Sequence, residues 1–248
     1  PFYIQTIGDC VGHGYARGAM LLMASEISMG EREKWGGDIA SEDQYGGGRV
    51  EIGGGRLSGD GSLGSWNARY VNEYGTLTRT KHGRHDLRRY SGQRAKAWGR
   101  SGVPDELEPI AREHPVRTVT LVDSYEDARD SIYAGYPVVV CSAFGFNSRR
   151  DREGFLKHNQ TWYHCMTFCA MDDQYRRPGL LLDNTSWGPD WVDGPKRHDQ
   201  PDGTGWVDAE TCDKMLRRDP DSFALSGYEG FPDNSKKLQM SDFLNVFS

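Results

Sequence analysis

Hydrophobic positions divide the chain into a part that predicts helices and a part that predicts strands. From Cys10 to about Met29 the sequence leaves little polar face, as expected of a buried helix. Asp9 precedes this segment as a candidate N-cap, and Gly30 follows it as a candidate C-terminal stop. Amphipathic patterns predict further helices at 65–74, 86–98, 105–113 and 124–133.

After residue 116 the pattern changes to runs of apolar and β-branched residues. These predict strands at 116–122, 137–144, 164–171, 180–184, 205–207 and 223–227. Between the first two predicted helices, residues 35–64 contain a glycine pair and two runs of three glycines. This segment is therefore predicted to be loop, with one short strand near 50–52.

Composition and charge narrow the class of protein. The 248 residues include 11% aromatic side chains, enough to build one large domain or two lobes. No window approaches the roughly 20 apolar residues of a membrane span, so a soluble protein without a membrane partner is predicted. The basic residues are scattered in a chain of net charge -6, which argues against a nucleic-acid partner. Five cysteines without dense spacing predict free thiols and favour a reducing compartment.

Cys10 stands at the start of the predicted buried helix. Unpaired backbone N–H groups and the positive end of the helix dipole favour a thiolate there. Gln5 lies upstream, and Gly8 allows a tight turn between the two residues. The side-chain amide of Gln5 and the backbone N–H of Cys10 would then form an oxyanion hole. The alternative is that Cys10 is a small core residue and Gln5 an ordinary loop amide.

A histidine and an asparagine follow in the strand-rich part. His164 begins an apolar segment, so it is predicted to lie at a strand end, on the edge of a cleft. The strand at 180–184 delivers Asn184 close to Trp187, and an amide there can hold the imidazole in one tautomer. Because side chains alternate along a strand, either a bulge turns Asn184 toward His164 or Thr185 takes that place.

These motifs, in this order, resemble the papain-like cysteine peptidases. The shared features are Gln before Cys at a helix start, His before an apolar strand, and Asn before Ser-Trp-Gly. The sequence around Gly59 and Gly61 is similar to the family's glycine-containing substrate-binding segment, and 137–140 is similar to the strand that precedes the histidine. The resemblance covers roughly residues 5–207.

The resemblance implies an α+β fold of two lobes with the active site in the cleft between them. Residues 1–115 would form a helical lobe that carries the cysteine. Residues 116–230 would form an antiparallel sheet or barrel that carries the histidine and the asparagine. Residues 231–248 would be a C-terminal extension.

The resemblance also implies peptide-bond hydrolysis. Cys10 would attack a peptide carbonyl as a thiolate, His164 would pair with it and protonate the leaving amine, and water would hydrolyse the thioester. Asn184 would orient His164, Gln5 would complete the oxyanion hole, and Trp187 would shield the contact between His164 and Asn184. The expected partner is a peptide or protein substrate, and no cofactor or metal is expected.

Gly59 and Gly61 would allow the substrate backbone to approach closely. Elsewhere the pattern departs from the family: the spacing from Gln5 to Cys10 is one residue short, Thr185 is an extra residue, and Asp9 replaces a small neutral residue. The charge of Asp9 opposes thiolate formation. Two alternatives therefore stay open: another thiol acyl-enzyme, such as an amidase, cell-wall endopeptidase or transpeptidase, and a catalytically weak binding module.

Other chemistry-bearing residues have plainer interpretations. His13 lies one helical turn after Cys10 and is the rival base, although a buried helix histidine is the favoured interpretation. Cys165 and Cys169 are interpreted as core residues, because a metal site would bring more ligands. The glycine runs lack the Gly-Lys-Ser/Thr ending of a phosphate loop.

Overall fold

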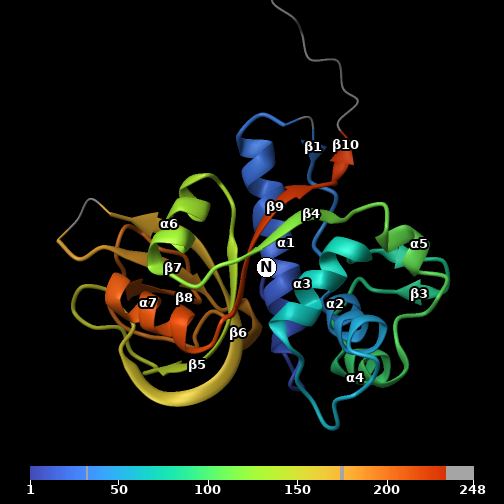
Figure 1. Cartoon of the computed structure of the whole chain (residues 1–248), viewed down its shortest axis with the longest axis horizontal. Coiled ribbons are helices and arrows are strands. Elements are labelled where there is room, and N and C mark those ends of the chain that lie inside the picture. Colours follow the sequence, from blue (N-terminus) through green and yellow to red (C-terminus); the bar gives the residue numbers. More distant parts are fainter. Residues whose placement is uncertain (32, 174–175, 233–248) are drawn as a thin grey trace, which may run out of the picture.

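The computed structural model describes residues 1–31, 33–173 and 176–232. Helix α1 (Cys10–Ser28) runs through the middle of the molecule, as Figure 1 shows, and confirms the predicted buried helix. Asp9 occupies its N-cap position but makes no side-chain cap. The predicted cap is wrong because the Asp9 carboxylate instead accepts a hydrogen bond from the Tyr90 hydroxyl at 2.9 Å.

Helices α2 to α5 lie on one side of α1 (Figure 1). They are α2 (Ser41–Gly47), the π-helix η1 (Gly48–Ile52), α3 (Gly64–Glu73), α4 (Gly92–Ser101) and α5 (Glu108–Ala111). A small hairpin, β2 (Lys81–His82) with β3 (His85–Asp86), ends where the helix predicted at 86–98 would begin, and α4 starts only at Gly92. The other two-stranded pair is β1 (Glu33–Lys34) with β10 (Phe231–Pro232).

The loop predicted at 35–64 is helical over residues 41–52, so that prediction and the strand near 50–52 are wrong. The glycines of this segment are packing residues. A Cβ on Gly46 would lie 2.7 Å from the Cβ of Trp98, and a Cβ on Gly47 would overlap the ring of Tyr70. Only glycine lets α2 approach α3 and α4 this closely.

A six-stranded antiparallel sheet lies on the other side of α1 and confirms the predicted strands. Its order is β4-β9-β5-β6-β7-β8. The strands are β4 (Val116–Leu121), β5 (Val138–Phe146), β6 (His158–Asp172), β7 (Gly179–Asp183), β8 (Thr204–Asp208) and β9 (Asp221–Tyr228).

Both faces of the sheet are covered. Side chains alternate along β5, so Val139 joins the core under α1, while Val138 and Val140 join the core with α6 (Tyr125–Tyr133) and α7 (Ala209–Arg218). The lobe boundaries predicted at 115 and 230 stay a prediction. The predicted extension 231–248 lies outside the described residues except for β10.

His164 lies within a strand, because β6 already begins at His158; the predicted position at a strand end is wrong. The pairing of β5 with β6 is regular as far as Ser142 opposite His164, and then shifts before Phe144. His164 is therefore the last residue of the regular ladder.

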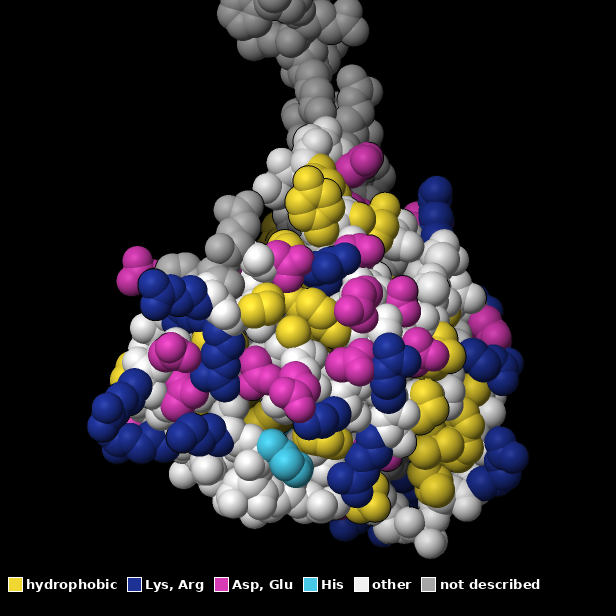
Figure 2. Space-filling model, turned by 60° about the vertical axis from the view of Figure 1, so that its left-hand side comes forward, with side chains coloured by type: hydrophobic (Ala, Val, Ile, Leu, Met, Phe, Trp, Pro, Cys, Tyr) yellow, Lys and Arg dark blue, Asp and Glu magenta, His cyan; other side chains and the backbone are white. Residues whose placement is uncertain are grey.

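Charged side chains of both signs are interspersed on the face shown in Figure 2. Ion pairs also join side chains of the sheet region: Arg177 contacts the carboxylates of Asp151 at 2.6 Å and Asp208 at 2.9 Å. Among the described helices, none has both the length and the apolar character needed to cross a lipid bilayer.

Replacing Gly47 with alanine tests the packing of α2. A helical glycine exchanged for alanine without a clash would gain up to about 1 kcal/mol of stability. Because a Cβ on residue 47 would overlap the ring of Tyr70, the substitution should destabilise the protein instead. We expect the free energy of unfolding, measured with urea, to fall by about 1–3 kcal/mol. The exposed Gln93→Ala on α4 is the control and should change little. A more stable Gly47→Ala protein would contradict the packing.

Candidate active site

Cys10 begins α1 and lies against strand β6. Burial raises the pKa of the Cys10 thiol to about 12, with the nearby Cys141 and Asp9 acting in the same direction. The backbone N–H groups of Cys165 and Val11 act against them and lower this pKa. The Cys165 amide directly follows His164 in the chain, so the Cys10 thiol lies against the backbone of β6 one residue after the predicted base. The start of a helix lowers the pKa of a thiol, but at Cys10 the effect of burial is larger and in the opposite direction.

Three of the five cysteines cluster here. Cys141 and Cys165 are directly opposite each other on β5 and β6, with their Sγ atoms 2.8 Å apart. All five cysteines are free thiols. This agrees with the absence of a disulfide pattern in the sequence.

His164 is fixed by Asn184. The two side chains are 5% and 1% exposed, and Nε2 of His164 lies 3.0 Å from Oδ1 of Asn184. Because an amide oxygen can only accept, this contact selects the tautomer with the proton on Nε2. Nδ1 is left as an acceptor, and it makes no hydrogen bond within the described parts of the chain. Ser186 donates to the same Oδ1 at 3.0 Å.

The extra residue after Asn184 is taken up by a short helix. Strand β7 ends at Asp183, and the 3-10 helix η2 spans Thr185–Trp187. Asn184 lies at the junction, where its backbone N–H donates to Gly203 O at 3.1 Å. Of the two arrangements left open by the sequence, Asn184 makes the contact with His164.

Burial keeps His164 neutral. It lowers the pKa of His164 to about 4, with a further lowering from His13, while the hydrogen bond with Asn184 acts in the opposite direction. The ring of Trp187 stacks on the imidazole with centroids 4.2 Å apart and planes 23° apart. Trp162 packs edge-on against Trp187 at 4.8 Å. These aromatic rings contribute to the burial that lowers the pKa of His164.

Gln5 lies beside the turn that carries Asn184. Its backbone N–H donates to Ser186 O at 2.8 Å, and its side-chain Nε2 donates to Ile7 O at 3.2 Å. Its Oε1 is buried without a hydrogen-bond partner among the described residues. The side chain is thus close to the site, but one N–H of its amide is engaged within its own loop.

Gly59 and Gly61 lie in a loop that runs beside Gly8. Both have positive φ, 75° and 98°, a conformation that favours glycine. Gly61 N–H donates to Gly8 O at 2.8 Å, and Gly8 N–H donates to the Asp60 carboxylate at 3.2 Å. The structure therefore brings this loop to the turn that leads into Cys10.

Two polar contacts near the site were not predicted from the sequence. Arg17, seven residues after Cys10, forms an ion pair with Asp183 at 2.6 Å and so ties α1 to the strand that ends before Asn184. His13 is buried as predicted, and its Nε2 lies 3.6 Å from Asp9 and 3.5 Å from the Ser41 hydroxyl. Neither pairing has a local sequence signal beyond the helical spacing of Asp9 and His13.

The sequence matches no model of a known protein family and no curated protein. The structure is similar to solved cysteine proteases. Xylellain, a cysteine protease from Xylella fastidiosa, is 15% identical with a TM-score of 0.63; the match covers 91% of this chain and 82% of xylellain. Digestive procathepsin L 3 of the Tenebrio molitor larval midgut is 12% identical with a TM-score of 0.54, over 91% of this chain and 66% of the procathepsin.

A third similar structure is the proform of Amb a 11, a cysteine protease and ragweed pollen allergen. It is 15% identical with a TM-score of 0.52, and the match covers 94% of this chain and 61% of that chain. At these identities the likeness shows the fold. The chain has the papain-like fold, a mixture of helices and antiparallel sheet, and the fold predicted from its sequence is confirmed.

The raised pKa of Cys10 predicts the pH dependence of its alkylation. A thiol alkylates as the thiolate, and far below its pKa the thiolate fraction rises tenfold per pH unit. With the Cys10 pKa near 12, we expect the rate of carboxamidomethylation by iodoacetamide to rise about tenfold per unit from pH 7 to 9. Mass spectrometry of the peptide that contains Cys10 measures this rate.

Asp9→Asn is the matched variant, because it removes the charge and keeps an acceptor for Tyr90. It should alkylate several-fold faster than the wild type at pH 7. A wild-type rate that is already constant below pH 7 would instead show a preformed thiolate–imidazolium pair.

Proposed function

We propose that this protein is a cysteine peptidase that cleaves peptide bonds with Cys10 as nucleophile and His164 as base. The observation that carries the proposal is the contact of His164 Nε2 with Asn184 Oδ1 at 3.0 Å, which presents Nδ1 as the proton acceptor. The papain-like fold and the position of Cys10 Sγ beside the Cys165 amide support it. Substrates in this proposal are peptides or proteins.

The proposed reaction begins from a neutral pair. Because burial raises the pKa of Cys10 and lowers that of His164, proton transfer accompanies attack. Nδ1 of His164 accepts the Sγ proton while Sγ bonds to the carbonyl carbon, so an imidazolium and a tetrahedral oxyanion form together. The imidazolium then protonates the leaving nitrogen, the C–N bond breaks, and a thioester remains on Cys10. Water, deprotonated by His164, hydrolyses the thioester and restores the thiol.

The oxyanion is stabilised by backbone and side-chain N–H groups. In the proposal, the backbone N–H of Cys10 is the first donor. The side-chain amide of Gln5 becomes the second when it turns from Ile7 O, its present acceptor at 3.2 Å. Such a donor typically contributes about 10²–10³-fold to the rate.

The remaining predicted residues position the site and the substrate. Trp187, stacked on His164, keeps water from the contact between His164 and Asn184. Gly59 and Gly61, which have no side chains, let a substrate backbone lie against the loop beside Gly8.

A second candidate is a papain-like binding module with little turnover. The observation that favours it is Asp9, fully buried and close enough to Cys10 to raise the thiol pKa. A carboxylate at this position works against the chemistry that the rest of the site supports.

Replacing Cys10 with alanine separates the two candidates. We expect the wild type to cleave members of a random peptide library and to be labelled by a peptidyl electrophile at Cys10, and Cys10→Ala to do neither. Mass spectrometry of the products and of the protein gives both results. A folded wild type that neither cleaves nor labels would refute the peptidase and favour the binding module.

Replacing Asn184 with alanine tests the orientation of His164. Without Oδ1 the imidazole loses its 3.0 Å contact, and we expect kcat to fall about 10²-fold. Thr185→Ala, at the neighbouring position, is the control and should retain most of the activity. The opposite result would assign the orienting role to Thr185.

A further inference from the structure

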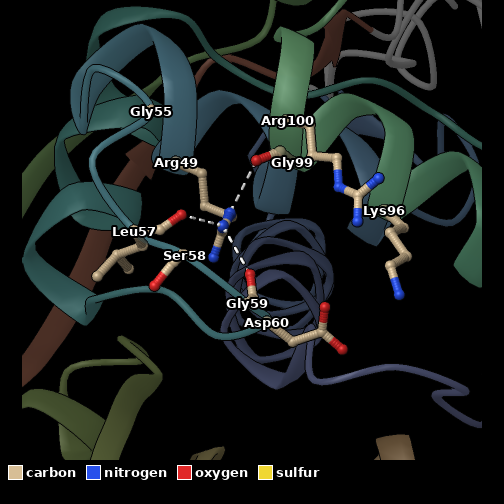
Figure 3. Close-up of a pocket in the computed structure, with 9 residues that line it drawn as sticks. All are labelled: Arg49, Gly55, Leu57, Ser58, Gly59, Asp60, Lys96, Gly99 and Arg100. Atoms are coloured by element: carbon tan, nitrogen blue, oxygen red, sulfur yellow. Dashed lines mark hydrogen bonds between the residues drawn. The ribbon is translucent and has the colours of Figure 1, made fainter.

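A pocket opens where the loop of residues 57–60 meets helix α4 (Figure 3). Its volume is about 300 Å³. The loop contributes Leu57, Ser58, Gly59 and Asp60 to its walls, and α4 contributes Lys96 and Arg100. The pocket therefore begins at the same loop that runs beside Gly8 and the start of α1.

The loop is held in place by one buried arginine. Arg49, 4% exposed, donates from Nε to Gly99 O on α4 at 2.9 Å. Its Nη2 donates to Leu57 O and Gly59 O, each at 2.9 Å, and its Nη1 donates to Gly61 O. The dashed lines in Figure 3 mark bonds of this set. Because Arg49 joins the loop to α4, both walls of the pocket are fixed before any ligand enters.

The charge of the pocket is unbalanced. Lys96 and Arg100 are exposed, and they lie one helical turn apart on α4, where like charges repel. In Figure 3 their charged ends point to the same side of the pocket. Neither forms an ion pair within the described residues. Asp60 contributes a carboxylate, but its Oδ2 already accepts the Gly8 N–H at 3.2 Å.

This local excess of positive charge contrasts with the net charge of -6 of the whole chain. A carboxylate that entered the pocket would relieve the repulsion between Lys96 and Arg100. Its two oxygens could also accept a pair of parallel hydrogen bonds from the planar guanidinium of Arg100. Anionic ligands, rather than neutral or cationic ones, therefore fit this pocket best.

The pocket and the turn that leads into Cys10 share one loop. Gly59 and Asp60 belong to both the pocket and the loop, and Gly61 is hydrogen-bonded to Gly8, two residues before the nucleophile. We infer that Lys96 and Arg100 select peptides that carry an Asp or Glu side chain a few residues from the cleaved bond. The inference rests on the proposed function, since it names the substrate class of that site.

Binding to the Cys10→Ala protein tests the inference without turnover. The probes are decapeptides that are uncharged apart from one Glu, Gln or Lys, which is moved from position to position. They carry a zwitterionic rhodamine label, and fluorescence anisotropy gives each Kd. We expect one position at which Glu binds about tenfold more tightly than Gln, with the advantage falling as salt rises from 50 to about 300 mM.

The charge-reversed protein Lys96→Glu/Arg100→Glu, also carrying Cys10→Ala, should lose this preference and bind the Lys peptide best. Lys81→Glu, an exposed lysine outside the pocket, is the matched control and should keep the preference for Glu. Thermal unfolding of both variants shows that they are folded. Equal binding of Glu and Gln peptides at every position, or a preference unchanged by the reversal, would overturn the inference.

Labelling of wild-type Cys10 by a peptidyl electrophile reports separately on the proposed function. Labelling without a preference for Glu would overturn the pocket and leave the peptidase. A preference for Glu without labelling would support the pocket and contradict the peptidase.

Discussion

The close approach of α1 to the sheet is the constraint on which the site depends. Gly14 and Gly18 are four residues apart on the side of α1 that faces β5 and β6. A Cβ on Gly14 would lie 2.6 Å from Cys165 Sγ, and a Cβ on Gly18 would lie 2.7 Å from a methyl group of Val139. Without side chains at these positions, the helix that begins at Cys10 lies directly on the strand that contains His164. The ion pair of Arg17 with Asp183 extends the same contact to β7.

The same packing sets the electrostatics of the site. The Cys10 thiol is buried between α1 and the sheet, and the His164 imidazole is buried against two indole rings, so burial raises the pKa of Cys10 and lowers that of His164. Each shift favours the neutral form. The packing that buries both groups therefore disfavours a thiolate–imidazolium pair at rest, and in the proposed chemistry the charges arise during attack.

Much of this arrangement could be predicted from the sequence, because Cys10, His164 and Asn184 each stand beside a strongly apolar helix or strand. The helicity of residues 41–52 could not be predicted. Glycine has a low helix propensity, so these residues predict a loop. Gly46 is needed because α2 packs against Trp98, a residue far along the chain. The cap assigned to Asp9 failed for the same reason, since Tyr90 takes its carboxylate. Arg49 could not be recognised either, because its acceptors are backbone carbonyls.

In the proposed reaction Cys10 carries the acyl group and His164 enables the transfer. Rapid quench of the protein with a peptide p-nitrophenyl ester, followed by mass spectrometry of the digested chain, tests it most directly. We expect an acyl group on Cys10 in the wild type within the first turnover, and none in His164→Ala. An acyl group on another residue, or on Cys10 equally in both proteins, would contradict it.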